Sequence, residues 1–348
     1  MGARPDNSGT DSHVRPGCTL RTGVSPAHPQ RIALLGECLI ELNGEPFGNM
    51  YQTFGGDTLN TAVYLARLMS GAVEVQYLTA IGTDALSEGM LRRWRAEGLE
   101  TSAVLRDPTR LPGLYLIQLD EQGERSFLYW RRQSAARYLL RHPEFERVAA
   151  ALAEAEIIYV TGISLAILPP GDRARLVALL AQLAARGKKL VLDSNYRAAL
   201  WSSASAARST LRALLPSVCL LLTTFDDEQQ IWRDDTVDAA RERLHAAGAR
   251  VVLIKRGSVG CLYSDRTATV AVAAPPVTEV VDTTAAGDAF NAAFLAGWLT
   301  GLDAQESCRL GNALAGIVIQ HRGAIIPAAS TPALPALRQR IGLTGVGQ

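Results

Sequence analysis

The segment Asp282-Thr-Thr-Ala-Ala-Gly-Asp288 decides more about the fold than any other stretch of this 348-residue chain. It follows the apolar, β-branched stretch 277–281 and leads into a helical pattern, Ala289-Phe-Asn-Ala-Ala-Phe-Leu-Ala-Gly-Trp298. A turn of small residues that opens a helix leaves backbone N–H groups free at the positive end of the helix dipole, which suits an anion. Because residues 285–287 carry almost no side chain, a phosphate can approach their amides closely.

Asp288 falls in the first turn of this helix, beside the expected anion. A carboxylate next to a phosphate is repelled by it, so its position suggests a chemical role. It is explained if Asp288 accepts the proton of a hydroxyl that attacks the phosphate. The alternative is that Asp288 only caps the helix or interacts with its dipole, which is the usual role of an aspartate in a first turn.

The composition indicates a globular protein of one large α/β domain or two smaller ones, since 48% of the residues are hydrophobic and the net charge is +1. The near-neutral charge argues against nucleic acid as a partner, and no apolar run reaches the roughly 18 residues of a membrane span. The five cysteines are scattered and form no CxxC pair, which is typical of core thiols in a reducing cytosol and not of a disulfide or zinc framework. Neither GxxxxGK[ST] nor GxGxxG occurs, so the commonest nucleotide-binding loops are absent.

The first 30 residues differ from the rest, because they are rich in Gly, Pro, Ser and Arg and show no apolar period. We expect a disordered N-terminal extension over 1–30, a folded domain over 31–340 and a short tail over 341–348. The extension lacks the apolar core of a secretory signal, so a cytoplasmic location is expected.

Apolar strands and amphipathic helices alternate from Arg31 onward, which indicates a mostly parallel sheet covered on both faces by helices. The predicted strands are Ile32–Leu35, Val75–Ala80, Ile157–Val160, Leu190–Leu192, Val218–Leu222 and Val251–Ile254. The predicted helices are 58–70, 86–97, 172–186, 205–215, 236–247, 286–299 and 304–320.

One region departs from this alternation. Residues 113–131 contain two alternating strands around a polar Asp-Glu-Gln-Gly turn, which predicts a β-hairpin. With the extended segment 41–54, the hairpin can form a small sheet apart from the main domain. Such a sheet has no core of its own and must cover something, so we expect a lid over a site or a contact with a second subunit.

Two motifs offer contacts to a polar substrate. In Phe54-Gly-Gly-Asp-Thr-Leu-Asn60, Gly56 permits close backbone approach and Asn60 presents a donor and an acceptor to a polyol; the alternative is a tight turn with Asp57 or Thr58 as helix cap. In Tyr129-Trp-Arg131, alternation places Tyr129 and Arg131 on one face with Tyr115 of the partner strand. That face suits a sugar acid, with Arg131 for the carboxylate, although an arginine solvated beside core aromatics gives the same pattern.

Three further clusters follow predicted strands, where open α/β sheets bind ligands. Asn195 and Arg197 are candidates for phosphate or substrate contacts, and Lys255-Arg-Gly-Ser-Val-Gly260 predicts a turn close to a nucleotide. Asp227 and Glu228 can hold water around Mg²⁺, or they belong to a charged cluster that simply starts a helix.

Taken together, these motifs resemble the ribokinase-like (PfkB) carbohydrate kinases, and within them most closely the kinases of 2-keto-3-deoxygluconate. The resemblance covers about residues 31–330, and it rests on Gly55-Gly56…Asn60 and Asp282–Asp288 together with Gly36-Glu-Cys-Leu-Ile-Glu-Leu42, Leu111–Tyr115, Tyr129–Arg131, Gly162–Leu168, Asn195–Arg197 and Arg322–Pro327. It implies a three-layer α/β/α sandwich with a β-lid that often mediates dimerisation. It also implies ATP-dependent phosphorylation of the 6-hydroxyl of 2-keto-3-deoxygluconate, with ATP and Mg²⁺ as cofactors.

The resemblance assigns roles to individual residues. Asp288 matches the catalytic base, and Ala285, Ala286 and Gly287 match the anion hole for the transferred phosphoryl group. The substrate contacts would be Gly56, Asn60, Tyr115, Tyr129, Arg131, Arg197 and Asp288, and the ATP side would be Asn195, Lys255, Gly257, Gly260, Ala286, Gly287 and Asn312. In many relatives K⁺ binds near the loop that begins at Asp282, which makes K⁺ a candidate activator.

Two features depart from the family pattern. The usual Gly-Ala-Gly-Asp is Ala285-Ala-Gly-Asp288 here, which is tolerable unless Ala285 needs a positive φ. The usual Asn-x-x-Glu near the metal is not intact around Asp226–Glu228. Two other functions stay open: a kinase of a neutral sugar, of fructokinase or ribokinase type, and a sugar-binding homologue without catalysis.

Overall fold

A central eight-stranded sheet organises the computed structural model, which describes residues 30–119 and 125–343. The strand order is β14-β13-β12-β11-β10-β9-β1-β4, and only β13 and β14 run antiparallel to their neighbours. The strands are β1 (Gln30–Leu35), β4 (Val73–Leu78), β9 (Ile157–Thr161), β10 (Lys189–Asp193), β11 (Val218–Thr224), β12 (Val251–Lys255), β13 (Cys261–Ser264) and β14 (Thr269–Val272). The six predicted strands are all present, but Val75–Ala80 was wrong at its end, because after Leu78 the chain leaves this sheet and β5 (Ala80–Gly82) pairs with β6 (Leu105–Asp107).

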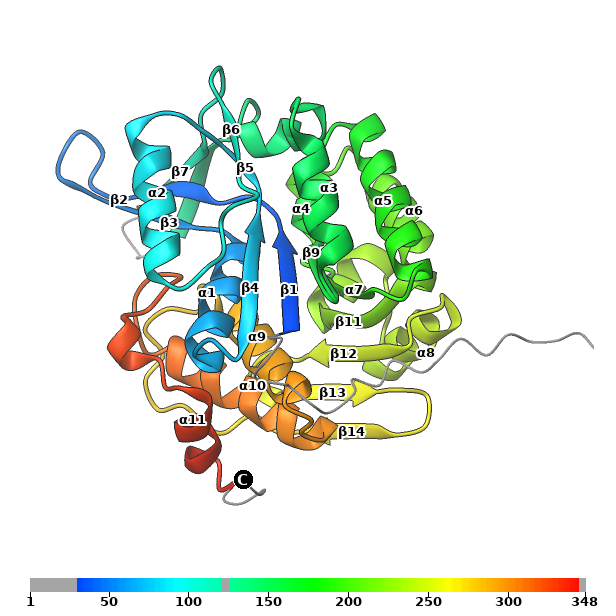
Figure 1. Cartoon of the computed structure of the whole chain (residues 1–348). Helices are drawn as coiled ribbons and strands as arrows, with labels where there is room; N and C mark the ends of the chain where they lie inside the picture. The colour runs from blue at the N-terminus through cyan, green and yellow to red at the C-terminus, as the bar shows by residue number, and fades with distance from the viewer. Residues whose placement is uncertain (1–29, 120–124, 344–348) are drawn as a thin grey trace, which may run out of the picture.

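Helices cover both faces of the sheet, as the fold class requires (Figure 1). One face packs against α1 (Asp57–Met69), α2 (Ala85–Ala96), α9 (Ala286–Leu299), α10 (Ala304–Val318) and α11 (Leu334–Arg340). The other packs against α3 (Phe145–Glu154), α4 (Gly162–Ala166), α5 (Pro170–Ala185), α6 (Ala204–Leu214), α7 (Phe225–Trp232) and α8 (Val237–Ala246). Side chains alternate between the two cores, so Ile157 and Tyr159 join the first and Ile158 and Val160 the second. This is the three-layer α/β/α sandwich that the resemblance implied.

The parallel strands bring chemically active residues to one edge of the sheet. Asp193 ends β10, Thr224 ends β11 and Lys255 ends β12, while Glu37 follows β1. Because carboxyl ends of parallel strands share an edge, these side chains lie near one another, and α9 begins at the same place.

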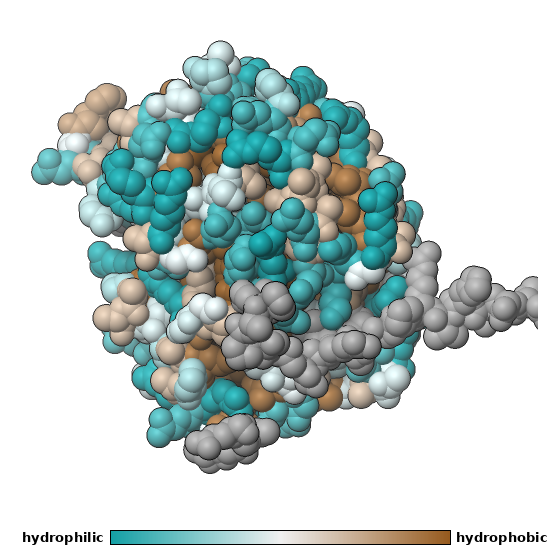
Figure 2. Space-filling model, in the orientation of Figure 1, coloured by the Kyte–Doolittle hydropathy of each residue, from teal (hydrophilic) through white to brown (hydrophobic). Residues whose placement is uncertain are grey.

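A second sheet of four strands stands at this edge, in the order β3-β2-β7-β8. It consists of β2 (Leu39–Gly44), β3 (Met50–Gly55), β7 (Gly113–Leu119) and β8 (Arg125–Trp130), and Tyr115 pairs with Tyr129. The predicted hairpin and its extended partner are therefore present, although the polar turn itself lies outside the described residues. The tip of the β2–β3 hairpin projects clear of the main body, at the upper left of Figure 2, and Phe47 there is fully exposed.

The expected extension over 1–30 lies outside the described residues except for Gln30, the first residue of β1, and of the expected tail only 341–343 are described. Cys38, Cys261 and Cys308 are free and buried, as core thiols should be, and Cys219 is buried as well. None of the helices in the described ranges has the length and apolar character that a membrane span requires.

Tyr64 connects α1 to the C-terminal segment that closes the site. Its hydroxyl donates to the carbonyl of Ala324 at 2.7 Å and accepts the N–H of Ile326 at 3.1 Å, and the side chain is fully buried. We expect Tyr64→Phe to lower the free energy of unfolding by about 1–3 kcal/mol, because two buried backbone groups lose their partner. Urea denaturation measures this, and the exposed Tyr51→Phe is the control; equal stability of both variants would contradict the assignment.

Candidate active site

A cavity of about 580 Å³ lies between the small sheet and the carboxyl edge of the large one. It gathers most of the predicted site residues, namely Gly56, Asn60, Tyr115, Tyr129, Arg131, Asn195, Arg197, Asp227, Lys255, Ala285, Ala286, Gly287 and Asp288. These come from segments that are far apart in the sequence, and the lid strands, the strand ends and the start of α9 each supply a wall.

The turn before α9 is left-handed at Ala285, whose φ is 59°. The position where the family pattern has glycine therefore does require a positive φ, and here an alanine occupies it at a conformational cost. The N–H of Ala286 donates to Thr283 at 3.3 Å, whereas within the described residues no acceptor receives the N–H of Ala285 or Gly287. Two amides at the positive end of a 14-residue helix thus stay available to an anion.

Asp288 lies in the first turn of α9 and accepts a hydrogen bond from Asn60 Nδ2 at 2.8 Å. Burial, together with the neighbouring charges of Asp57 and Asp193, raises the pKa of this carboxyl to about 7, even though Asn60 and Lys255 act to lower it. A carboxylate with a pKa near the working pH is suited to accept a proton. A purely capping role would not need this environment.

Two more buried carboxylates belong to the same network. Asp57 accepts from Asn195 Nδ2 at 2.7 Å, and burial raises its pKa. Asp193 accepts from Asn291 Nδ2 at 2.5 Å and from Lys255 Nζ at 3.3 Å. Lys255 is thereby held close to Gly287, since a Cβ added to that glycine would lie 3.5 Å from the ammonium group of Lys255. The positive charge of Lys255 therefore lies beside the turn that begins α9.

The lid supplies aromatic and cationic groups to the opposite wall. The rings of Tyr115 and Tyr129 lie 5.8 Å apart, as their register predicts. Arg131 lies beside Tyr129, with its guanidinium 5.8 Å from the ring centre, and it is ion-paired with the buried Glu37. Arg197 is exposed at the other side of the cavity and donates to the carbonyl of Tyr196.

Five predicted site residues do not line this cavity. Glu228 is buried in an ion pair with Arg243 and accepts from Thr223, and Asp282 accepts the N–H groups of Thr284 and Gly323, which ties the turn to the C-terminal segment. Gly257 and Gly260 form the turn after β12 with φ of 56° and 104°, and Asn312 donates to the carbonyls of Val272 and Ala273.

The donors present fit a magnesium ion that is held mainly by a bound phosphate. Asp226 and Asp227 line the cavity at the start of α7, and Asp227 already accepts from Ser194 Oγ at 3.0 Å. Among residues 30–119 and 125–343, no group of three or more His, Cys, Asp or Glu side chains could hold a metal alone. Mg²⁺ typically needs only one or two carboxylates besides water and substrate phosphate, so the set is sufficient. The helix start expected as the alternative for these acids is also present.

Sequence reasoning missed four participants: Glu37, Asp57, Asp193 and Asn291. Each carried a signal, because a polar residue in an otherwise apolar segment is expensive to bury without a purpose. Asn291 lies within the nearly all-apolar α9, and Glu37 and Glu41 interrupt an apolar run. Asp57 was considered only as a helix cap, which was wrong, because Gly56 is the cap and Asp57 is the first helical residue, where it accepts the N–H of Thr58.

Comparison with known proteins identifies the class. The family model of the pfkB family carbohydrate kinases matches residues 29–331, and the chain belongs to this family. A solved Escherichia coli protein assigned as ribokinase II, in complex with ATP and Mg²⁺, has the same fold, with a TM-score of 0.75 at 21% identity over 90% of this chain and 99% of that one.

Curated relatives are more specific. A 2-dehydro-3-deoxygluconokinase of Haemophilus influenzae is 52% identical over 85% of this chain and 96% of the relative. A protein of the same name from Escherichia coli K12 is 42% identical over 87% of this chain and 99% of the relative.

The left-handed turn yields a stability prediction. We expect Ala285→Gly to change the free energy of unfolding by less than about 1 kcal/mol, because relief of strain is offset by a more flexible unfolded chain. Ala285→Val should lower it by more than about 1 kcal/mol, since β-branched residues avoid positive φ. Chemical denaturation measures both, and equal values for the two variants would show that the turn does not hold Ala285 in this conformation.

Proposed function

We propose that this chain is a 2-dehydro-3-deoxygluconokinase, which transfers the terminal phosphoryl group of ATP to the 6-hydroxyl of 2-keto-3-deoxygluconate. The observation that carries the proposal is the buried Asp288, held by Asn60 at the mouth of the dipole-positive turn that begins α9. The family and the two relatives of that name, each covered almost completely, support the substrate.

In the proposed reaction, Asp288 accepts the proton of the 6-hydroxyl while the hydroxyl oxygen attacks the γ-phosphorus of ATP. The bond between the γ-phosphorus and the oxygen that bridges it to the β-phosphate breaks at the same time. Asn60 fixes one carboxylate oxygen of Asp288 and so orients the other. The N–H groups of Ala285 and Gly287, with Lys255 behind them, stabilise the negative charge on the transferred group. The products are the 6-phosphate, ADP and the proton on Asp288.

The acid end of the substrate is assigned to the lid side of the cavity. Arg131 and Arg197 are the cations available for a carboxylate, and Tyr115 and Tyr129 offer a flat surface with hydroxyl groups. Gly56 has no room for a side chain, because a Cβ there would collide with the carbonyl of Glu37. A glycine at this position therefore allows the turn to pack closely on the backbone of residues 37 and 38 at the wall of the cavity.

We assign the nucleotide to the side formed by Asn195, Lys255 and the turn 257–260. Asn312 supports that side by holding the backbone that follows β14. Mg²⁺ would be held by the phosphates and, through water, by Asp227, and it would neutralise phosphate charge there. Since Glu228 is committed to Arg243, it contributes indirectly. K⁺ near Asp282 stays a proposal, in which the ion would reinforce the loop that Asp282 already ties to Gly323.

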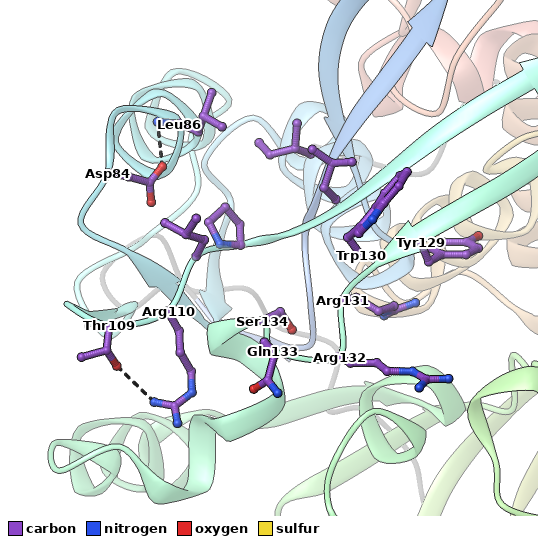
Figure 3. A pocket seen from close by; sticks show the side chains of 14 residues that line it. Asp84, Leu86, Thr109, Arg110, Tyr129, Trp130, Arg131, Arg132, Gln133 and Ser134 are labelled. Carbon is purple, nitrogen blue, oxygen red and sulfur yellow. Dashed lines mark hydrogen bonds between the residues drawn. The ribbon is translucent and has the colours of Figure 1, made fainter. Parts of the chain in front are cut away.

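We further infer a single kinase domain over 31–340 and a homo-oligomer formed through the lid. On the face of the lid sheet opposite to Tyr115, Ile40, Leu114 and Trp130 line a hollow of about 910 Å³ (Figure 3). Trp130 is 58% exposed, and exposed apolar patches of this kind mark association surfaces. A kinase works where ATP is supplied, so we infer a cytoplasmic location.

A neutral-sugar kinase is the second candidate, because the same base and turn serve any primary hydroxyl. Arg131 and Arg197 favour an acid over a neutral ketose. A non-catalytic sugar-binding role fits less well, since it leaves the buried Asp288 and its free amides without a use.

The base assignment predicts the behaviour of Asp288→Asn. We expect kcat to fall about 10²–10⁴-fold with little change in substrate affinity, because the amide cannot accept the proton. In the wild type, kcat/KM should rise with pH through about 7, because only the ionised carboxyl is a base and burial raises its pKa to about 7. Steady-state kinetics between pH 5.5 and 9 test both statements, and near wild-type turnover by the variant would mean that another group is the base.

The substrate assignment predicts the behaviour of Arg131→Gln, which keeps a donor for Glu37 and removes the cation. We expect KM for the keto-deoxy acid to rise about tenfold or more, because charge-assisted hydrogen bonds are lost, while KM for ATP stays unchanged. ATP consumption against a panel of keto-deoxy acids and neutral ketoses is the measurement. An unchanged KM for the acid, or wild-type preference for a neutral ketose, would overturn the choice of substrate.

A further inference from the structure

Glu37 is a buried carboxylate for which the proposed mechanism has no direct use. It follows β1 at the edge of the large sheet, is only 2% exposed, and lies beneath the lid. Three donors from the end of the lid converge on it: Nε of Arg131 at 2.8 Å, the terminal nitrogen NH2 of Arg131, and Oγ of Ser134. A buried charge needs this degree of compensation, so the arrangement is stable before any ligand binds.

The contacts determine which part of Arg131 faces the cavity. The guanidinium is planar and carries its donors in a fixed fork, so fixing Nε and NH2 fixes the direction of the remaining nitrogen, NH1. Within the described residues, NH1 has no partner, while Arg131 lines the cavity with its side chain only 12% exposed. A second carboxylate can therefore approach the free edge of a guanidinium that is already oriented.

The same segment contains a parallel case. Glu41, four residues later, is 3% exposed and accepts the hydroxyl of Tyr115, the other substrate-facing residue of the lid. Two glutamates of the apolar run Gly36–Leu42 thus each hold one lid side chain that borders the cavity. Burying two carboxylates under one small sheet costs free energy, so the simpler explanation is that both position lid side chains that border the cavity.

We propose that Glu37 is a positioning residue for substrate selection: its carboxylate orients the Arg131 guanidinium so that the free NH1 edge receives the carboxylate of a sugar acid. The inference rests on the proposed function, since it concerns the acid end of the same substrate. According to this proposal, the position of the Glu37 oxygen matters more than the negative charge of Glu37, because the substrate requires a correctly oriented Arg131 guanidinium.

Two conservative variants separate place from charge. Glu37→Gln keeps an oxygen at the same distance and removes the charge, whereas Glu37→Asp keeps the charge and withdraws the oxygen by one methylene. We expect Glu37→Asp to raise KM for 2-keto-3-deoxygluconate about tenfold and Glu37→Gln to raise it less than about threefold, with kcat and KM for ATP unchanged in both. In the Arg131→Gln background, Glu37→Asp should have no further effect on KM, because the residue acts through Arg131.

Glu97 provides the matched control, because it holds Arg67 through two contacts of 2.7 Å away from the cavity. Glu97→Asp should change thermal stability alone. Larger effects on KM from Glu37→Gln than from Glu37→Asp, or additive effects with Arg131→Gln, would overturn the inference while leaving the proposed function intact. Absence of turnover of the keto acid by the wild type would overturn the proposed function itself, and with it the inference.

Discussion

The structure depends on holding a carboxylate in the first turn of a buried helix, next to two other carboxylates. Burial and the charge of Asp57 together raise the pKa of Asp288 to about 7, against 3.8 for an ordinary aspartate. Between these two values the folded chain binds a proton that the unfolded chain has released. Stability from this group is therefore present at low pH and is lost as pH rises through 7, by about 4 kcal/mol in total. This loss of stability falls in the pH range in which the proposed base, Asp288, becomes ionised.

The surrounding fold limits the penalty by supplying amide donors. Asn60, Asn195 and Asn291 each donate to one carboxylate of the network, and Lys255 contributes a cation to it. Amides stabilise a carboxylate without neutralising it, so the site stays basic. The three asparagines come from α1, the β10 edge and α9, and this is why two helices and the sheet edge must meet at one place.

The architecture was predictable where a local pattern specified it. The period of apolar residues located the six parallel strands and the helices α1, α2, α5, α6, α8, α9 and α10 within a few residues, and a polar turn between alternating strands revealed the lid hairpin. The antiparallel β13 and β14 and the helices α3, α4, α7 and α11 were not predicted. Strands of four residues and helices of five to eight residues are too short to show a clear period, whereas α3 is as long as the predicted α8 and carries an amphipathic pattern that was missed. The motif residues that touch the cavity were predictable from small-residue turns. The pairing of Glu37 with Arg131 joins residues 94 positions apart and was not, since no local pattern encodes a partner at that separation.

The negative charge of the cavity explains why several features that reduce this charge or offset it occur together in its lining. Its lining includes six carboxyl groups, from Glu37, Asp57, Asp193, Asp226, Asp227 and Asp288, against three cations, from Arg131, Arg197 and Lys255. In the proposed function, two anionic ligands, a nucleotide and a sugar acid, bind there. Raised pKa values at Asp57, Asp227 and Asp288 lessen the repulsion, and the free amides at the start of α9 add positive potential without another side chain. In that proposal, the remaining negative charge favours a cation that arrives with the nucleotide, which is an electrostatic argument for an Mg²⁺ ion held mainly by phosphate.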